Sequence, residues 1–282
     1  MDTDDKINIK NADIPKPFIK WAGGKRQIIK ELTDSLPKNY NRYFEPFIGG
    51  GALFFAVRPK NAYISDINPE LINLYNTVKN NTHSLIKDLL RYKNTETEFY
   101  KIRNLDRTPD YKNLTNIEKA GRFIYLNKTC YNGLYRTNSK GQFNAPYGFY
   151  KNPNIIDEQN LKICSELLKE TEIGLSDFSN IENKIKTRDF VYFDPPYIPI
   201  NKTSSFTKYY KDDFNTGSQI KLKELCDRLN KKNIYFMLSN SYNETALNLY
   251  KEYNIKKINA IRAINCKADK RGTINELIIT NY

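Results

Sequence analysis

A short uncharged run that ends at two consecutive prolines constrains the fold of this chain more than any other feature. Phe190 to Phe193 form the run, and Asp194-Pro195-Pro196-Tyr197 follow directly. Such a run is typical of a strand that helices cover on both faces of a sheet. Because proline has no backbone N–H, the chain leaves the strand there as a stiff turn. We therefore expect a buried strand whose carboxyl end holds Asp194 beside the carbonyl group of Pro195.

The runs before and after this segment predict a doubly wound, Rossmann-like α/β sheet of mostly parallel strands. Tyr43 to Phe47 form a short, mostly apolar run that breaks at Gly49-Gly50-Gly51 and continues as a helix-compatible segment. Ala62 to Asp66 form a second strand, after which Asn68-Pro69-Glu70 supply the cap, the first-turn proline and an acid to another helix. The other predicted strands are 234–238 and, at the edge of the sheet, 255–264 and 274–280. In this architecture, ligands bind at the carboxyl ends of the strands.

The strand pattern fades between Thr77 and about Leu168, where the residues are helix-compatible and then, from Thr129 to Pro153, loop-like. We interpret this stretch as an inserted, mainly helical domain. The expected division is a first part of the catalytic domain at 1–77, the inserted domain at 78–167 and a second part of the catalytic domain at 168–282.

The charge of the chain favours a polyanionic partner. Its 282 residues include 45 Lys and Arg against 32 Asp and Glu, a formal net charge of +13. Nucleic acid is such a partner, although an A+T-rich coding bias toward Lys, Asn, Ile and Tyr gives the same excess. No apolar run is long enough to cross a bilayer, and the start of the chain is polar, so we expect a cytoplasmic protein without a membrane partner.

The few residues with metal-binding or nucleophilic side chains exclude several reaction classes. The chain has one histidine, His83, and its four cysteines are widely spaced, which leaves no zinc ligand set and disfavours Ser/His/Asp triads. Methylation of cytosine at carbon 5 needs a cysteine nucleophile that characteristically follows proline. Here Cys130, Cys164, Cys226 and Cys266 follow Thr, Ile, Leu and Asn, so we expect four structural thiols and no metal.

A glycine-rich turn and an acid near it indicate a nucleotide site. The turn Glu45-Pro46-Phe47-Ile48-Gly49-Gly50-Gly51 needs glycines for a sharp bend and for the close approach of a ligand, although a turn that merely links strand to helix fits as well. It does not match GxGxxG, and Gly23-Gly24-Lys25-Arg26 does not match a Walker A loop. Asp66 ends the second strand, where an acid accepts hydrogen bonds from ribose hydroxyls. Asn68 is better placed to cap the helix, which leaves Asp66 for the ligand.

The proline corner has the chemistry that methylation of an amino group requires. An adenine amino group is a poor nucleophile because its lone pair is delocalised into the ring. Two acceptors, the Asp194 carboxylate and the Pro195 carbonyl, can hold its two hydrogens and localise the lone pair for attack on a sulfonium methyl group. Tyr197 offers a flat face for the base. The alternative, a surface Asp-Pro turn, does not need an aromatic residue there.

A basic and aromatic stretch in the inserted domain indicates contact with nucleic acid. From Lys119 to Ile156 there is no Asp or Glu, whereas basic residues alternate with Tyr and Phe. The basic residues are Lys119, Arg122, Lys128, Arg136, Lys140 and Lys151. Basic side chains contact phosphates, and amides such as those of Asn132 and Asn138 reach bases. A solvated basic loop remains the alternative.

These motifs together resemble the Dam-type, GATC-specific DNA adenine methyltransferases of the D12 class. The similarity extends from about Pro17 to Tyr282. Residues 17–25 resemble the family's cofactor segment, 45–51 its glycine loop, Asp66 its ribose-binding acid and 194–197 its catalytic tetrapeptide.

The resemblance implies a function, a cofactor and a set of residues. The reaction is transfer of a methyl group from S-adenosylmethionine to the exocyclic amino group of a flipped adenine in duplex DNA, giving S-adenosylhomocysteine. The implied catalytic residues are Asp194, Pro195, Pro196 and Tyr197. The implied cofactor residues are Trp21, Lys25, Glu45, Pro46, Phe47, Gly49, Gly51, Asp66, Asp177, Phe178 and Asp194.

The resemblance also implies how DNA is read. Residues 131–136 and 142–148 resemble the family's target-recognition hairpin, in which Arg136 reads guanine while Leu134 and Pro146 touch neighbouring bases. Tyr135 is expected to be exposed. The expected DNA-binding residues are Asn132, Leu134, Arg136, Asn138, Lys140 and Pro146. Double-stranded DNA is the expected partner, with a separate cognate restriction endonuclease as a further one; the oligomeric state is left open.

Two other functions are compatible with the same motifs. The first is an RNA or protein amino-methyltransferase, since related prolyl turns serve guanine, RNA adenine and glutamine. The second is a non-catalytic DNA-binding subunit that kept the fold, against which the intact Asp194 and glycine turn argue.

Overall fold

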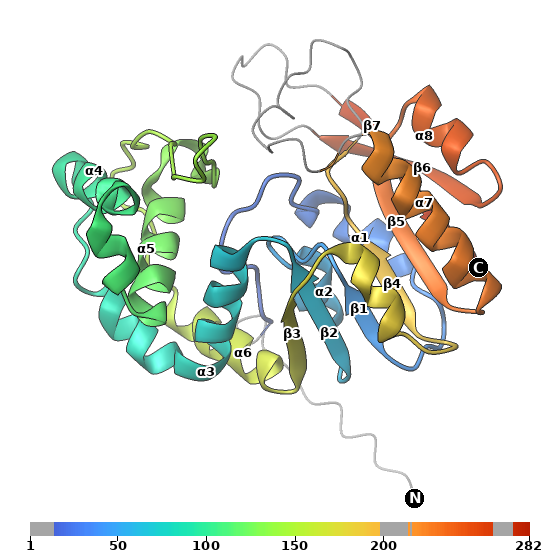
Figure 1. The fold of residues 1–282 in the computed structure, drawn as a ribbon, viewed down its shortest axis with the longest axis horizontal. Helices are drawn as coiled ribbons and strands as arrows, with labels where there is room; N and C mark the ends of the chain where they lie inside the picture. The colour runs from blue at the N-terminus through green and yellow to red at the C-terminus, as the bar shows by residue number, and fades with distance from the viewer. Residues whose placement is uncertain (1–13, 198–213, 215, 262–272) are drawn as a thin grey trace, which may run out of the picture.

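In the described residues, seven strands form one sheet in the order β3-β2-β1-β4-β5-β7-β6 (Figure 1). The computed structural model describes residues 14–197, 214, 216–261 and 273–282. The strands are β1 Tyr43–Glu45, β2 Ala62–Asp66, β3 Thr171–Leu175, β4 Phe190–Phe193, β5 Tyr235–Ser241, β6 Asn254–Ile261 and β7 Thr273–Thr280. Strands β1 to β5 pair in parallel, and β7 runs antiparallel between β5 and β6. The predicted, mostly parallel α/β sheet is thus present.

Eight α-helices and several short 3-10 helices accompany the sheet in the described residues. The α-helices are α1 Ile29–Asp34, α2 Ala52–Val57, α3 Pro69–Leu89, α4 Glu96–Asn104, α5 Asn116–Thr129, α6 Glu158–Lys169, α7 Thr216–Lys231 and α8 Glu244–Leu249. The 3-10 helices are η2 Arg26–Ile28, η3 Leu105–Arg107, η4 Pro109–Asn113, η5 Tyr131–Gly133 and η6 Phe178–Asn183. Over the described ranges, no helix combines the length and the apolar character that crossing a membrane requires.

The strands carry apolar side chains on both faces because helices cover both. Along β4, Phe190 and Tyr192 pack into a core that α1, α2, α3 and α6 share, whereas Val191 and Phe193 pack into a second core with α7 and α8. All four side chains are buried. The uninterrupted run in the sequence is therefore explained by burial on both sides, as expected for a central parallel strand.

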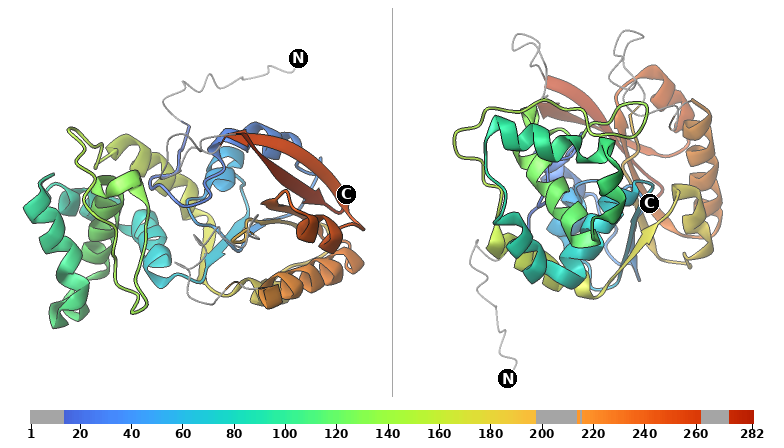
Figure 2. Two further views of the ribbon diagram at one scale, coloured as in Figure 1. Left: turned by 90° about the horizontal axis from the view of Figure 1, so that it is seen from above. Right: turned by 60° about the vertical axis from the view of Figure 1, so that its left-hand side comes forward.

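Helix α3 leads from the sheet to the helices beside it. Asn68 caps its start, since its Oδ1 accepts hydrogen bonds from the N–H groups of Glu70 and Leu71, and Pro69 occupies the first turn as predicted. The helix has one non-helical residue, Asn81, and packs against α5 and α6. Figure 2 shows α4 and α5, in green, beside the sheet. The apolar core continues without a break from the sheet into these helices.

Three expectations about the strands need correction. The strand that begins at Tyr43 ends at Glu45, because the chain turns at the following proline. The two late runs form strands, as expected, but only the first is at the edge of the sheet, because β7 pairs antiparallel with both β5 and β6; residues 262–264 of the first run lie outside the described residues. Strand β3 was not predicted, because at the sheet edge its five residues include a glutamate and a glycine and only Thr171 is fully buried.

Candidate active site and recognition hairpin

The order of the strands places the glycine turn and the proline corner side by side. Strand β1 has β2 as its neighbour on one side and β4 on the other, and the strands that follow β4 extend the sheet away from β1. The gap between the carboxyl ends of β1 and β4 is thus the point where the winding reverses, which is where ligands bind in open α/β sheets. The glycine turn follows β1 and the proline corner follows β4.

The glycine turn bends as sharply as predicted, but its close contacts are with the protein itself. Gly49 and Gly51 have φ angles of +46° and +70°, a region that favours glycine. A Cβ atom on Gly49 would lie 2.6 Å from Cδ1 of Trp21, and one on Gly51 would lie 2.7 Å from the hydroxyl oxygen of Tyr75. The glycines therefore allow Trp21 and Tyr75 to approach the backbone, a reason for glycine that the sequence did not indicate.

Asp66 joins the end of β2 to the glycine turn. Its Oδ2 accepts the N–H of Gly49 at 3.2 Å and its Oδ1 accepts the N–H of Asn68 at 3.0 Å. The sequence suggested that this carboxylate is left for a ligand alone, but in the structure both of its oxygens accept backbone hydrogen bonds. Each oxygen keeps a further lone pair. Burial raises the pKa of Asp66 to about 6.

Lys25 and Asp194 form a buried ion pair at the centre of the site. Nζ of Lys25 lies 2.7 Å from Oδ1 of Asp194, and the side chains are 5% and 21% exposed. The same ammonium group donates to the carbonyl of Gly23 at 2.5 Å and lies 4.6 Å from the ring centroid of Tyr197. Burial raises the pKa of Asp194 and the nearby Lys25 lowers it. The cofactor segment and the proline corner, far apart in sequence, thus meet here.

Glu45 is a second buried carboxyl group at this end of the sheet. Its Oε2 accepts a 2.5 Å hydrogen bond from the hydroxyl group of Tyr43. Burial raises the pKa of Glu45 well above its usual value, and the negative charge of Asp194 raises it further. Pro46, the next residue, is buried as well.

Two of the three predicted aromatic cofactor residues, Phe47 and Phe178, lie together. The rings of Phe47 and Phe178 stack with centroids 5.3 Å apart, and Phe214 meets both edge-on. Phe178 begins η6, which Asp177 caps by accepting the N–H of Ser179 at 2.9 Å. The loops after β1 and β3 therefore share one aromatic cluster beside the proline corner.

The proline corner is held by two residues that the sequence did not single out. The carbonyl of Pro196 accepts a 2.9 Å hydrogen bond from Gln219 of α7, and the hydroxyl of Tyr197 donates a 2.8 Å hydrogen bond to Glu276 of β7. Among the described residues, no donor forms a hydrogen bond with the carbonyl of Pro195. Gln219 and Glu276 lie 23 and 79 residues from their partners, so no local pattern identifies them.

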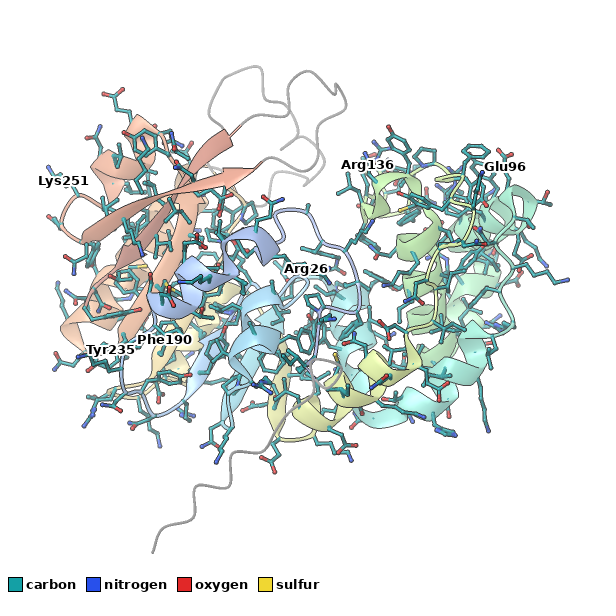
Figure 3. The ribbon with its side chains drawn as sticks, turned by 180° about the vertical axis from the view of Figure 1, so that it is seen from behind. Arg26, Glu96, Arg136, Phe190, Tyr235 and Lys251 are labelled. Carbon is teal, nitrogen blue, oxygen red and sulfur yellow. The ribbon has the colours of Figure 1, made fainter. Side chains whose placement is uncertain are left out.

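Residues 130–147 form a short hairpin that carries Arg136. Backbone bridges join Cys130 to Tyr147 and Thr137 to Phe143. Asn144 orients the guanidinium group of Arg136: its Oδ1 accepts Nε at 2.7 Å and its carbonyl accepts Nη2 at 3.1 Å. In Figure 3, Arg136 lies high in the view, whereas Phe190 and Tyr235, the first residues of β4 and β5, lie low on the other side of the molecule. The hairpin therefore lies toward the end of the sheet that carries the proline corner.

The other residues expected to contact DNA have different surroundings. Lys140 and Pro146 are exposed, and Asn132 and Leu134 are half-buried, with Asn132 at a φ of +59°. The amide group of Asn138 closes the tip of the hairpin: its Oδ1 accepts the N–H groups of Lys140 and Gln142, and its Nδ2 donates to the Gln142 side chain. Its side chain is thus engaged within the hairpin.

Two expectations about the stretch are wrong. Arg122 is buried, donates to the carbonyls of Ile102 and Arg103 and lies 2.8 Å from Asp106, so it has a structural role and is not placed to contact phosphate. Tyr135 is half-buried rather than exposed. Its ring stacks on Phe123, with centroids 4.4 Å apart, and on Trp21, with centroids 5.5 Å apart.

Trp21 consequently connects the glycine turn with the hairpin. One part of its ring lies against Gly49, and the ring stacks on Tyr135 of the hairpin. Asn127 of α5 reinforces this connection, since its side chain bonds both the N–H and the carbonyl of Lys20 and also donates to the carbonyl of Gly133. The predicted cofactor segment and the predicted recognition hairpin are therefore in direct contact.

The thiol groups of the described cysteines are structural. Cys130, Cys164 and Cys226 are free and buried, and burial raises the pKa of each thiol, for Cys130 and Cys164 to about 12. Cys266 lies outside the described residues. His83 is exposed on α3. Within the ranges that the structure describes, no three His, Cys, Asp or Glu side chains are arranged to hold a metal ion.

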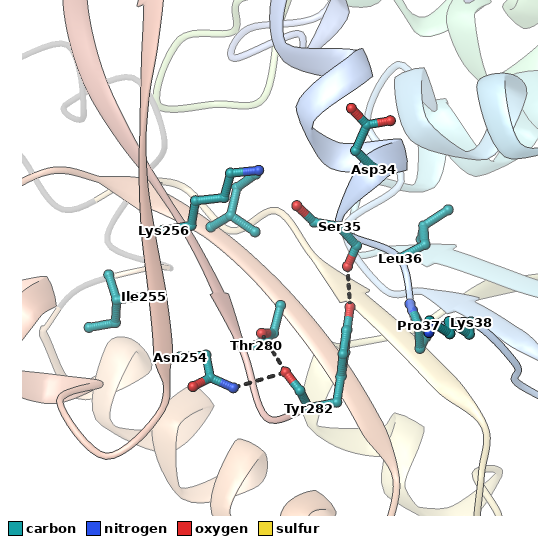
Figure 4. Close-up of a pocket in the computed structure, with 11 residues that line it drawn as sticks. Asp34, Ser35, Leu36, Pro37, Lys38, Asn254, Ile255, Lys256, Thr280 and Tyr282 are labelled. Atoms are coloured by element: carbon teal, nitrogen blue, oxygen red, sulfur yellow. Dashed lines mark hydrogen bonds between the residues drawn. The ribbon is translucent and has the colours of Figure 1, made fainter.

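A hollow of about 500 Å³ lies between the end of α1 and strands β6 and β7 (Figure 4). Tyr282 reaches across it and donates a 2.7 Å hydrogen bond to the carbonyl of Ser35. Thr280, which lines the hollow, pairs with Met237 near the start of β5, whereas Glu276 pairs with Ser241 at its end. The hollow is therefore at the amino ends of the parallel strands, away from Asp194.

Known proteins with similar sequences identify the family. A family model described as D12 class N6 adenine-specific DNA methyltransferase matches residues 21–264. The chain is 47% identical to the type II methyltransferase M.MjaIII of Methanocaldococcus jannaschii, over 95% of this chain and 99% of the relative. It is 43% identical to the type II methyltransferase M1.LlaDCHI of Lactococcus lactis subsp. cremoris, over 97% and 98%, and 30% identical to the DNA adenine methylase of Escherichia coli K12, over 93% and 94%. The chain therefore belongs to the D12 class of N6 adenine-specific DNA methyltransferases.

Proposed function

We propose that this enzyme methylates the exocyclic amino group of an adenine that is flipped out of duplex DNA, within a GATC site. The observation that carries the proposal is the proline corner at the carboxyl end of β4. There the Asp194 carboxylate and the carbonyl of Pro195, which no described donor occupies, lie beside the glycine turn. These are two hydrogen-bond acceptors for the two hydrogens of one amino group.

The residues around the glycine turn fit S-adenosylmethionine, the methyl donor that membership of a methyltransferase family implies. When bound, it supplies an electrophilic methyl group on a positively charged sulfur. Asp66 keeps lone pairs for ribose hydroxyls, Phe47 and Phe178 offer apolar ring surfaces, and Asp194 supplies negative charge. The other residues proposed to bind it are Trp21, Lys25, Glu45, Pro46, Gly49, Gly51 and Asp177.

The corner activates the base by geometry and charge. The Asp194 carboxylate and the Pro195 carbonyl accept one N–H each, which localises the nitrogen lone pair, and the carboxylate stabilises the positive charge that develops on the nitrogen. Flipping the base costs a few kcal/mol. Stacking on Tyr197 returns about 1–3 kcal/mol and the bond to Asp194 about 1.5–3 kcal/mol, so these contacts offset the extrusion. Before the base arrives, Lys25 neutralises Asp194.

We propose that residues 78–167 form a target-recognition domain that reads the site through the hairpin. Arg136, oriented by Asn144, donates two hydrogen bonds to O6 and N7 of guanine, and Leu134 and Pro146 contact the neighbouring bases. Lys140 and Lys151, both exposed, contact phosphates. The names of the type II relatives support a restriction endonuclease of matching specificity as a separate partner.

Restriction analysis of DNA from a host that expresses the enzyme tests the proposal. DNA from that host is digested with GATC-cutting nucleases that are blocked by, or indifferent to, adenine methylation. We expect resistance to the blocked nuclease alone, and none when Asp194→Ala is expressed instead. Complete cleavage by both nucleases, with N6-methyladenine detected elsewhere in the DNA, would refute the GATC assignment. Label from tritiated S-adenosylmethionine in RNA or protein, but not DNA, would support the rival amino-methyltransferases.

A further inference from the structure

Tyr197 lies beyond the end of β4, where its backbone is no longer paired with a neighbouring strand. β4 ends at Phe193, and Asp194 and two prolines separate it from Tyr197. The hydroxyl group of Tyr197 donates a hydrogen bond to Oε2 of Glu276, 2.8 Å away. We propose that Glu276 is a positioning residue that acts through this bond and fixes the Tyr197 ring in the orientation that receives the target base. The proposal rests on the base-stacking role proposed for Tyr197 above.

Glu276 offers a rigid anchor because strand pairing holds it on both sides. It lies in β7 opposite Ser241 of β5 and opposite Ile258 of β6. The main chain at Glu276 therefore cannot move without breaking two ladders. Among the described residues, Tyr197 has no strand pairing of its own, so the hydrogen bond ties its ring to a rigid part of the sheet.

A hydrogen bond at the phenol oxygen fixes a ring in two respects. It holds the far end of the ring axis in place. Because a phenol O–H prefers to lie in the plane of the ring, it also restricts rotation about that axis. Gln219 of α7 donates to the Pro196 carbonyl and Lys25, just before η2, lies over the ring, so neighbours from three separate parts of the chain hold the corner. The bond to Glu276 is the one that acts on the ring's outer end.

Glu276 also influences Asp194 through its charge. Burial raises the pKa of Asp194, Lys25 lowers it, and the negative charge of Glu276 raises it. Among the described residues, the charged and titratable groups that interact with Asp194 are Lys25, Glu45, Tyr192, Tyr197 and Glu276. A test must therefore separate the hydrogen bond from the charge. Glu276→Gln keeps an acceptor and removes the charge, whereas Tyr197→Phe removes the hydroxyl group and keeps both the ring and the carboxylate.

The experiment measures single-turnover methylation by the full chain on a duplex with adenine at the target position. A second duplex, with 2-aminopurine at that position, reports base stacking by its fluorescence. We expect Tyr197→Phe and Glu276→Ala each to lower the rate roughly ten- to a hundredfold, the size expected for one hydrogen bond to a charged group, with unchanged DNA affinity. The double variant should lose no more than either single variant, because both remove the same bond. Glu276→Ala should also change the 2-aminopurine emission, since the stacked base is less firmly held.

Two matched variants separate positioning from charge and from general damage. Glu276→Gln should restore most of the rate and move the acid limb of the pH–rate profile to lower pH, because the charge that raises the pKa of Asp194 is gone. Glu252→Gln, an exposed carboxylate before β6, removes a charge without touching the site and should behave as wild type.

Several results would overturn the proposal. A wild-type rate for Glu276→Ala would do so, as would losses that multiply in the double variant, because Glu276 would then act independently of Tyr197. Should Glu276→Ala fail to fold, a wild-type rate for Tyr197→Phe decides against it equally. Tyr197→Ala separates the base-stacking role of Tyr197 from the positioning role of Glu276. A normal rate for Tyr197→Ala would refute the base-stacking role itself. A low rate for Tyr197→Ala together with a normal rate for Glu276→Ala would refute only the positioning role.

Discussion

Replacing Lys25 by Met should make methylation unusually sensitive to acid. The substitution removes the ammonium group that lies 2.7 Å from Oδ1 of Asp194 and leaves a side chain of similar length. Asp194 has to be ionised to accept a hydrogen from the base. Burial already raises its pKa and Lys25 opposes this, so loss of Lys25 raises the pKa further. The active form of the enzyme is then lost at a higher pH than in the wild type.

The distance between Lys25 and Asp194 sets the minimum rise in the pKa of Asp194 that loss of Lys25 should cause. Two unit charges 2.7 Å apart attract each other by about 1.5 kcal/mol even at the dielectric constant of water. That energy corresponds to about a tenfold change in a protonation equilibrium. On the acid limb, the rate of Lys25→Met relative to its own alkaline plateau should therefore be lower than that of the wild type by about tenfold or more. Normalising to the plateau separates the titration from any loss of cofactor affinity.

The assay is a pH profile of single-turnover methylation on a short duplex at saturating S-adenosylmethionine. Lys30→Met is the matched control, since Lys30 is an exposed lysine on α1 that pairs only with Asp34 among the described residues. Its profile should coincide with that of the wild type. An acid limb of Lys25→Met that stays in place, or moves to lower pH, would show that the ion pair does not control the ionisation of Asp194.

Further changes test other parts of the site. Asp194→Ala should abolish turnover and leave most duplex binding, measured by gel shift; near-normal methylation would remove Asp194 from the mechanism. Arg136→Ala should reduce discrimination against a substituted guanine by about 1–3 kcal/mol, or roughly ten- to a hundredfold. If the ratio of the rates on the normal and the guanine-substituted duplex is the same for the variant and the wild type, Arg136 does not read this base. Lys140→Ala should weaken binding to all sequences alike and lower the salt slope by about 0.9, and an unchanged slope would count against a phosphate contact. Gly51→Ala should destabilise the protein, in thermal melts, by about 1–2 kcal/mol for its φ of +70° and further for the overlap with Tyr75. Gly141→Ala, with a φ of +78° and no atom within 4 Å of the added Cβ, measures the backbone part alone, so equal losses for the two glycines would show that the contact with Tyr75 is unimportant.

The contact between Trp21 and the hairpin suggests how the two ligand sites are kept in register. Trp21 lies against Gly49 of the glycine turn and stacks on Tyr135 of the hairpin. Both contacts are apolar and closely packed, so neither segment can shift without the other. A protein that has to bring a base and a methyl donor together gains from such a connection, because a displacement of about 1 Å is enough to slow a reaction substantially.

The sequence by itself determined the elements whose signals are local. The run Phe190 to Phe193 and the prolines after it specify a buried strand and its end, since burial on both faces demands apolar side chains and proline cannot continue a ladder. Asn68 and Pro69 likewise specify the start of α3. These features depend on neighbours within a few residues, and the structure has them where the sequence places them.

Only the tertiary structure decided which groups meet at the corner. Lys25 and Asp194 are 169 residues apart in sequence, and Tyr197 and Glu276 are 79 apart; nothing in the local sequence of either residue specifies its partner. Their meeting depends on the order of the strands, which inserts β7 beside β5 and places β1 against β4. That order is set by packing of whole layers, whose energy is summed over many distant side chains. For the same reason the half-buried β3 and the engaged side chains of Arg122 and Tyr135 emerged only once the chain was folded.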